Sequence, residues 1–350
     1  MMHDILPSLL KWQAQGLSAA IATVVKTWGS SPRPAGSRMA IAVNGEFAGS
    51  VSGGCVETAV IEEAMNVMKT GAPKLLQFGV ADETAWSVGL TCGGKIEVLL
   101  EPFYDKKFFE PLRVNLAGKE PVVMATVIRG ASTITGRHLL VSRAGTIAGD
   151  LENPELISSI QQAAPAFLER EHTTVLTFGE TEIFVESCFP PPKLIIVGAV
   201  HIAVPLAHIA KTLDFNVILV DPRGAFASTA RFPHVDQLVR QWPEEAMAEI
   251  GIDAGACIVI LSHDPKLDDP AVKTALQHHP AYIGVLGSRK THEKRFRRLL
   301  AEGVTEEQLR RVHAPIGLNI GATTPAEIAV SIMAEIVAQR RRMRLVGSDS

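Results

Sequence analysis

The chain has 350 residues, of which 47% are hydrophobic, and a formal net charge of −3 with histidine neutral. This length predicts roughly two or three domains with apolar cores, and the composition excludes a disordered chain. The charge gives no overall attraction to nucleic acid, and the two basic segments, residues 290–298 and 340–344, lack interleaved aromatic side chains. We expect a solvated helix face and a basic helix end there, and no nucleic acid partner.

The cysteines and the N-terminal segment bear on the cellular compartment. Four cysteines, at positions 55, 92, 188 and 257, form no Cys-x-x-Cys pair, so neither a disulfide framework nor a structural zinc site is expected. The first sixteen residues lack a basic segment followed by an apolar one, and no apolar run reaches the ~18 residues that span a bilayer. We therefore expect a cytoplasmic protein without a membrane span, whose thiols stay reduced.

The first part of the chain predicts an α+β lobe. The apolar periodicity and the Asn44-Gly45 turn signal predict a helix at 4–15, strands at 19–27, 38–43 and 46–51, a helix at 56–70, and strands at 74–78 and 95–101. Short strands continue the same lobe at 122–129, 137–141, 175–177 and 182–186, around one helix at 154–168. We recognise no internal repeat in this sequence.

Three consecutive prolines after Phe189 cannot lie inside a sheet, so they predict a linker. We expect an N-terminal lobe at 1–188, a linker at 189–192 and a second domain at 193–350. Beyond the linker, unbroken apolar strands alternate with helices, at 193–197, 216–220, 256–261 and 281–286. That alternation is typical of a parallel sheet covered on both faces. The predicted fold class is α/β, with an N-terminal α+β lobe followed by a doubly wound, Rossmann-like domain.

The turn after the first strand of the second domain only partly fits a dinucleotide-binding fingerprint. Gly198 and Ala203 occupy the first and third glycine positions, but Val200 stands where a second glycine admits the pyrophosphate. Asp221 ends the next strand, where it would either bind a ribose or cap the turn into Pro222. NAD(P) binding, and with it an NAD(P)-dependent oxidoreductase, is therefore a weak alternative.

Two of the cysteines lie beside glycine pairs. Cys55 follows Gly53-Gly54 and precedes a predicted helix, whose unpaired N–H groups would favour the thiolate and hold an anion. Cys92 precedes Gly93-Gly94 in a comparable loop. The pattern leaves three roles open for the two cysteines: thiolate ligands for a soft metal, sulfur carriers, or members of two loops that surround one ligand. Cys188 and Cys257, in apolar surroundings, are expected to act as small buried hydrophobic residues.

A third loop, residues 28–37, is rich in Gly, Pro and Ser. It contains Arg33 and is followed directly by Arg38. Guanidinium groups and hydroxyls suit phosphates or heterocycles rich in polar groups. We therefore add Arg33 and Arg38 to the candidate ligand site.

Several separate motifs, in the same order, resemble the XdhC/CoxI family, accessory factors for molybdenum hydroxylases such as xanthine dehydrogenase. In the first lobe they are GSSPRPAGSRM (29–39), GSVSGGCVE (49–57) and LTCGGKIEVLLEP (90–102). In the second they are KLIIVGAVHIAVPLAHIAKTLDFNVILVDPR (193–223), LSHDPKLDDP (261–270), YIGVLGSRKTHEKR (282–295) and APIGLNIGATTPAEIAVSIMAEIVA (314–338).

The resemblance implies a chaperone rather than an enzyme. Members of the family are thought to bind molybdenum cofactor, a pterin dithiolene, and to hold it while a cysteine desulfurase sulfurates it. They then insert it into the client hydroxylase. Cys55 and Cys92 would contact molybdenum or relay sulfur. We further expect a homodimer.

The resemblance also implies the binding residues, motif by motif. They are Arg33, Ser52, Gly53, Gly54, Cys55, Glu57, Cys92, Gly93 and Gly94 in the first lobe, and Gly198, His201, Asp221, His263, Asp264, Asp268, Gly287, Ser288 and Arg289 in the second. The family turn resembles Gly-x-Gly-His, so Val200 is a departure that disfavours close pyrophosphate approach. His263 and Asp264 follow a strand end, where open α/β sheets place their sites.

Overall fold

The computed structural model describes residues 2–31, 33–79, 94–103, 106–118, 120–169 and 171–345. The chain divides into two compact units, Met1–Pro190 and Pro191–Ser350. Each unit is described by itself.

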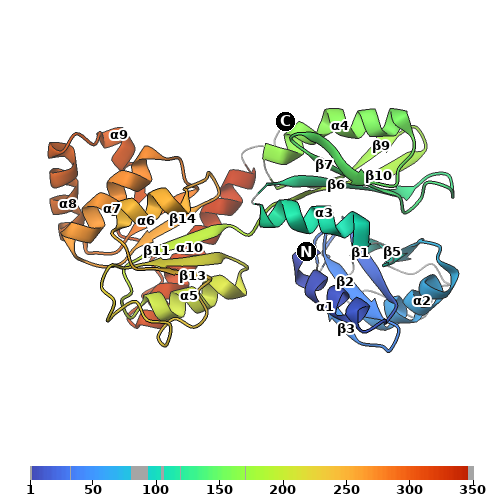
Figure 1. The fold of residues 1–350 in the computed structure, drawn as a ribbon, viewed down its shortest axis with the longest axis horizontal. Helices are drawn as coiled ribbons and strands as arrows, with labels where there is room; N and C mark the ends of the chain where they lie inside the picture. The colour runs from blue at the N-terminus through green and yellow to red at the C-terminus, as the bar shows by residue number, and fades with distance from the viewer. Residues whose placement is uncertain are drawn as a thin grey trace. The chain divides into compact units, whose positions relative to one another are not determined.

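The first unit contains two five-stranded antiparallel sheets. The first sheet has the order β3-β2-β1-β5-β4 and the second has the order β8-β7-β6-β10-β9 (Figure 1). The elements of the first half are α1 (Met2–Ala14), β1 (Ala19–Trp28), β2 (Arg38–Ala42), β3 (Phe47–Gly49), α2 (Glu57–Thr70), β4 (Lys74–Phe78) and β5 (Lys95–Pro102). Those of the second half are α3 (Lys106–Ala117), β6 (Val122–Arg129), β7 (His138–Ser142), β8 (Gly145–Gly149), α4 (Pro154–Glu169), β9 (Thr173–Phe178) and β10 (Thr181–Cys188).

The two halves of this unit are an internal structural repeat, so the expectation of no repeat was wrong. The order of helices and strands is the same in each half, and each sheet has the same strand order. The register agrees as well, because Met39 pairs with Gly49 in the first half and Leu139 pairs with Gly149 in the second. From here on, the first half is called repeat 1 and the second half repeat 2.

The registers also assign equivalent residues in the central strands. Thr23 pairs with Arg38 in repeat 1, and Thr126 pairs with His138 in repeat 2, which makes Arg38 and His138 equivalent. An irregularity in β1 near Val25 has its counterpart in β6 near Ile128. The repeat is hard to see in the sequence because the β1–β2 connection is longer in repeat 1, which shifts the alignment, and few residues are identical.

Each sheet of the first unit is covered on one face by its own helix. Helix α2 packs on the first sheet through Val60, Ala64 and Val67, and α4 packs on the second through Ile160 and Phe167. The other faces meet through a larger core to which α1 and α3 contribute, and through a small one with one residue each from β1, β5, β6 and β10, namely Val25, Leu99, Ile128 and Phe184. Because these four residues are equivalent in pairs, an approximate two-fold relation joins the repeats.

Ion pairs cross between the repeats in the same reciprocal way. Arg38 of repeat 1 pairs with Glu186 of repeat 2, and His138 of repeat 2 pairs with Glu101 of repeat 1. Glu101 and Glu186 are themselves equivalent by register, since they lie opposite Ile21 and Met124. The repeats are therefore tied together by two related charge pairs.

The second unit is the predicted doubly wound domain. Its six-stranded parallel sheet has the order β13-β12-β11-β14-β15-β16 (Figure 1). Its elements are β11 (Lys193–Val197), α5 (Ala203–Thr212), β12 (Asn216–Val220), β13 (Gln237–Val239), α6 (Pro243–Ile250), β14 (Cys257–Ile260), α7 (Pro265–Gln277), β15 (Tyr282–Val285), α8 (Arg289–Ala301), α9 (Glu306–Leu309), β16 (Val312–His313) and α10 (Pro325–Leu345).

Alternation along β11 explains why both faces of this sheet are covered. Leu194 and Ile196 point into a core with α5 and α10, and Ile195 and Val197 point into a second core with α6 and α7. The fold class is thus confirmed, although the edge strands β13 and β16 were not predicted. Among the described residues, no helix is both long and apolar enough to cross a membrane.

Candidate functional site

The loop before α2 presents Cys55. Gly53 and Gly54 have φ values of 83° and 120°, a region that glycine adopts without strain, and they turn the chain from β3 toward the helix. Cys55 is partly exposed, is not in a disulfide, and packs against the apolar core beneath α2. The sequence therefore placed this thiol correctly before the helix.

The carboxylate of Glu57 occupies the donors of this loop. It accepts from Ser50 Oγ at 2.8 Å, from the N–H groups of Ser52, Gly53 and Gly54 at 2.9, 3.0 and 2.9 Å, and from Ser52 Oγ. The expectation that these N–H groups are unpaired was therefore wrong. An external anion would bind them only by displacing Glu57, so Glu57 holds the loop rather than exposing a vacant anion site.

The charge state of Glu57 follows from these contacts. Partial burial raises its pKa, but the hydrogen bonds from Ser52 and Ser50 outweigh that effect and bring the pKa down to about 2. Glu57 is thus ionised at neutral pH. Ser52 Oγ completes the arrangement by accepting from the N–H of Cys55 at 3.0 Å.

The second cysteine loop is only partly described. Cys92 and Gly93 lie outside the described residues, so their assignments stay predictions. Gly94 is described, and a Cβ there would lie 2.5 Å from the carbonyl oxygen of Ser30. A glycine is therefore required for the close approach of this strand to the 28–37 loop, in which the side chain of Arg33 is exposed.

Arg38 does not belong to the ligand site that we predicted. It is 4% exposed, and its guanidinium group binds the carboxylate of Glu186 through two donors. Burial lowers its pKa, but the Glu186 carboxylate more than compensates, so the pKa of Arg38 is raised. The correction has a simple reason: the partner lies 148 positions away in the sequence and joins the two repeats.

In the second unit, the predicted residues lie where the strands of the parallel sheet end. Because all six strands run in one direction, the loops after β11, β12, β14 and β15 meet at one edge. The predicted residues in or next to those loops are Gly198, His201, Asp221, His263, Asp264, Gly287, Ser288 and Arg289. The side chains of His201, His263, Ser288 and Arg289 are exposed at this edge.

Gly198 is required by its surroundings. Its φ is 103°, and a Cβ would lie 2.9 Å from the backbone nitrogen of Ser262 in the neighbouring loop. We expect Gly198→Ala to lower the free energy of unfolding of the second unit by about 2–3 kcal/mol, through backbone strain and the clash. Hydrogen exchange of β11 and β14 amides would measure this loss. Gly224→Ala, where a Cβ meets nothing within 4 Å, is the control, and equal behaviour of the two variants would contradict the expectation.

Asp221 caps the turn and does not face a ligand. It is fully buried and accepts from the N–H of Ala199 at 2.8 Å and from the backbone and side chain of Arg223. Burial raises its pKa, but these hydrogen bonds outweigh burial and lower the pKa overall. Of the two roles considered for Asp221, the structure shows the cap and not the ribose contact. The N–H of Ala199, in the turn after β11, is already used by Asp221.

Asp268 also has a structural role in place of the predicted ligand contact. It is 1% exposed and accepts from Ser262 Oγ and from Arg295 Nη2, the latter at 2.6 Å. Arg295 in turn contacts His292 Nδ1 at 2.9 Å, and His292 Nε2 contacts the Gly287 carbonyl oxygen at 3.0 Å. This network links the loops after β14 and β15.

Sequence reasoning missed this network. Arg295 lies in the basic segment expected to be a solvated helix face, yet it is 2% exposed. Asp269 pairs with Arg298 of the same segment at 2.6 Å. The signal that could have revealed these pairs is the adjacent Asp268-Asp269 on α7, because two neighbouring buried carboxylates need cationic partners.

The remaining residues of this edge cap helices or remain exposed. Asp264 caps α7 by accepting from the Lys266 N–H, and Ser288 caps α8 by accepting from the Thr291 N–H. His263 has a φ of 61°, an uncommon value for a residue with a side chain, which holds it outward at the strand end. Among the described residues, no group of three His, Cys, Asp or Glu side chains converges to hold a metal ion.

Comparison with known proteins defines the class. The XdhC Rossmann domain matches residues 194–336, and the XdhC and CoxI family matches residues 12–79 and 116–179, one segment in each repeat. The chain is 30% identical over 349 residues to a Bacillus subtilis (strain 168) protein described as a probable subunit of xanthine dehydrogenase, covering 98% of this chain and 99% of that protein. The chain therefore belongs to the XdhC and CoxI family.

Two further relatives extend the comparison. The Escherichia coli (strain K12) molybdenum cofactor insertion chaperone PaoD is 25% identical over 326 residues, which are 93% of this chain and 84% of that one. A crystal structure described as a xanthine dehydrogenase from Bacillus halodurans superposes with a TM-score of 0.80 at 25% identity, covering 98% of both chains. The similarity thus covers both units.

Proposed function

We propose that this protein binds molybdenum cofactor and inserts it into a molybdenum hydroxylase of the xanthine dehydrogenase type. Membership of the family along both units supports this role, as does the name of the PaoD relative. The observation that supports a binding site at Cys55 is that this cysteine is partly exposed on a loop held in place by Glu57. When bound, the cofactor supplies the molybdenum centre for the client; the protein supplies a soft sulfur donor and a rigid loop.

We extend the proposal to sulfuration of the cofactor. A cysteine desulfurase would supply the sulfur while this protein holds the cofactor. Cys92, the second thiol beside a glycine pair, is proposed to act with Cys55. The desulfurase, the client, a homodimer and a cytoplasmic location stay predictions.

The oxidoreductase alternative gains no support from the second unit. Its ribose contact, Asp221, is fully buried, and Val200 replaces the second glycine of the fingerprint. The chaperone proposal, which needs no dinucleotide, is preferred.

The test is retention and transfer of the cofactor. Protein and molybdenum cofactor released from a donor enzyme are mixed without oxygen, and co-eluting molybdenum and pterin fluorescence are measured, followed by activation of an apo-hydroxylase. We expect stoichiometric retention by the wild type and at least a tenfold loss in Cys55→Ala, because one metal-thiolate contact exceeds ~1.4 kcal/mol. Cys92→Ala is examined in parallel.

Cys188→Ala is the matched control, because Cys188 packs against an apolar core near Arg38, where burial raises the pKa of its thiol. It should retain cofactor as the wild type does. Full hydroxylase activation by Cys55→Ala would remove the thiol from the proposal, and no retention by the wild type would refute the chaperone role itself.

A further inference from the structure

A cavity of about 650 Å³ opens within the first unit, between the repeats. Its wall includes Pro73 and Glu101 of repeat 1 and Phe108, Arg137, His138 and Asp150 of repeat 2. The volume is in the range of small-molecule sites, ~300–1,000 Å³. None of the residues that we predicted to bind cofactor lines this cavity.

The cavity exists where the two-fold relation between the repeats is broken. In repeat 1 the equivalent position holds Arg38, whose long side chain is buried and reaches the carboxylate of Glu186. In repeat 2 the shorter His138 stands there, with its Nε2 at 2.8 Å from Glu101 Oε2. The shorter side chain leaves space that an arginine would fill.

The floor and wall of the cavity have a definite chemistry. Thr126 Oγ1 lies 3.0 Å from His138 Nδ1, so the imidazole is held from both sides. The ring of Phe108 lies 4.8 Å from that of His138 and contributes an apolar part of the wall. Among the described residues, His138 uses one lone pair of Glu101 Oε2, and an ionised carboxylate has two on each oxygen, so lone pairs remain on both oxygens for a ligand.

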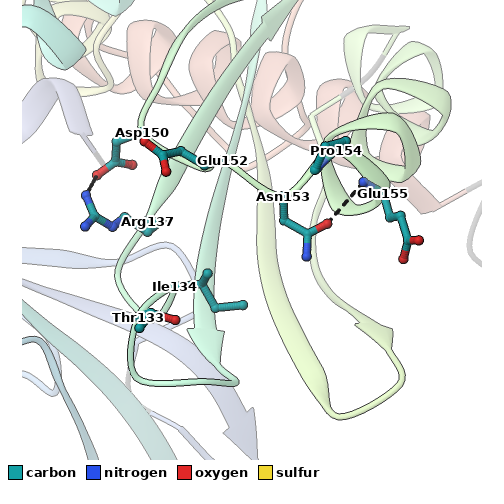
Figure 2. A pocket seen from close by; sticks show the side chains of 8 residues that line it. All are labelled: Thr133, Ile134, Arg137, Asp150, Glu152, Asn153, Pro154 and Glu155. Atoms are coloured by element: carbon teal, nitrogen blue, oxygen red, sulfur yellow. Dashed lines mark hydrogen bonds and ion pairs between the residues drawn. The ribbon is translucent and has the colours of Figure 1, made fainter.

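A second hollow, of about 720 Å³, continues from the first. The two share Thr133, Arg137 and Asp150, and Figure 2 shows Arg137 and Asp150 next to one another on one side of the hollow, joined by an ion pair of 3.0 Å. Both side chains of this pair are about half exposed, at 50% and 47%. A ligand held in the cavity could therefore extend a substituent past this pair.

The balance of charge selects the ligand. Each charged group named in the wall already has a partner, His138 with Glu101 and Arg137 with Asp150, so the wall has no surplus of positive charge for a polyphosphate. The lone pairs left on Glu101 favour a ring with adjacent N–H donors. A carboxylate accepts two parallel N–H bonds, as it does from an arginine fork, and a 2-amino-4-oxopyrimidine ring presents the same pair of donors. Phe108, which lines the cavity, offers an apolar contact for that ring.

We propose that this cavity binds the 2-amino-4-oxopyrimidine ring of its ligand through Glu101 and Phe108. Guanine and pterins share this ring, and the proposed role in molybdenum cofactor maturation, on which the inference rests, makes a pterin the expected source. Arg137 lies at the rim, where it can contact a phosphate on the substituent.

The test uses His138→Arg, which gives repeat 2 the residue found in repeat 1. The arginine is expected to pair with Glu101 and fill the cavity without loss of folding. 6-Carboxypterin is titrated by fluorescence, and guanosine and adenosine monophosphates by equilibrium dialysis. We expect His138→Arg to weaken 6-carboxypterin binding at least tenfold and Glu101→Gln roughly tenfold, since a charged acceptor is lost. His279→Arg, on an exposed loop of the second unit, is the matched control.

The outcomes separate the alternatives. Binding of 6-carboxypterin that His138→Arg abolishes supports the assignment with a pterin as source, and binding of guanosine monophosphate alone supports it with a guanine nucleotide. Equal binding of adenosine monophosphate, no binding of either ring, or unchanged binding in His138→Arg overturns it. Retention of molybdenum cofactor by the wild type in that last case would leave the proposed function standing.

Discussion

Arg38→Met is expected to destabilise the first unit by about 3–5 kcal/mol, because it leaves the Glu186 carboxylate buried without a cation. The two side chains are 3% and 6% exposed, so little water can replace the lost partner. Urea unfolding followed by circular dichroism would measure the change in the free energy of unfolding. The equivalent pair in repeat 2 is more exposed to solvent, with His138 at 15% and Glu101 at 11%. Glu101→Gln should therefore lower the free energy of unfolding by less.

A double variant separates charge from packing. Arg38→Met with Glu186→Leu removes both charges and should recover most of the stability lost in the single variant. If Arg38→Met lowers the free energy of unfolding by less than ~1 kcal/mol, the pair contributes no more than an exposed ion pair, which would contradict the expectation from its burial. The folded fraction of each variant is checked by size-exclusion chromatography.

The strands that could be predicted from the sequence are those with a strong local pattern of apolar residues. β11 and β12 are unbroken apolar runs, and their observed bounds are the predicted ones. β8 was missed because Gly145–Gly149 contains two glycines and one large apolar residue, so its place in the sheet depends on pairing with β7. The repeat was missed because what its halves share is topology and register more than residue identity.

The location of a candidate site residue could be predicted where the residue directly follows a strand of the parallel sheet. Strand ends of a parallel sheet must meet, which brought Gly198 and His263 to one edge. Arg38 and Asp268 could not be assigned this way, because whether a charged residue is exposed depends on partners distant in sequence, Glu186 and Arg295. A charged side chain near a motif is therefore weak support for ligand contact.

Glu57→Gln is expected to loosen the Cys55 loop and to lower cofactor retention as strongly as Cys55→Ala. Glutamine turns an NH₂ group toward N–H donors that now face a carboxylate, so we expect a loss of about 2–3 kcal/mol in the free energy of unfolding. Glu62→Gln, exposed on the same helix, is the matched control. Unchanged stability together with unchanged retention would contradict a positioning role.

The pH dependence gives a readout that a general loss of packing would not produce. The pKa of Glu57 is about 2 in the folded chain, below its ordinary value of 4.5, so the folded state binds its proton less tightly than the unfolded state does. The stabilisation from Glu57 is therefore complete above pH 4.5 and is lost as the pH falls toward 2. The difference in free energy of unfolding between wild type and Glu57→Gln should shrink over that interval. A difference that stays constant from neutral pH to pH 2 would show that the loop does not depend on the Glu57 charge.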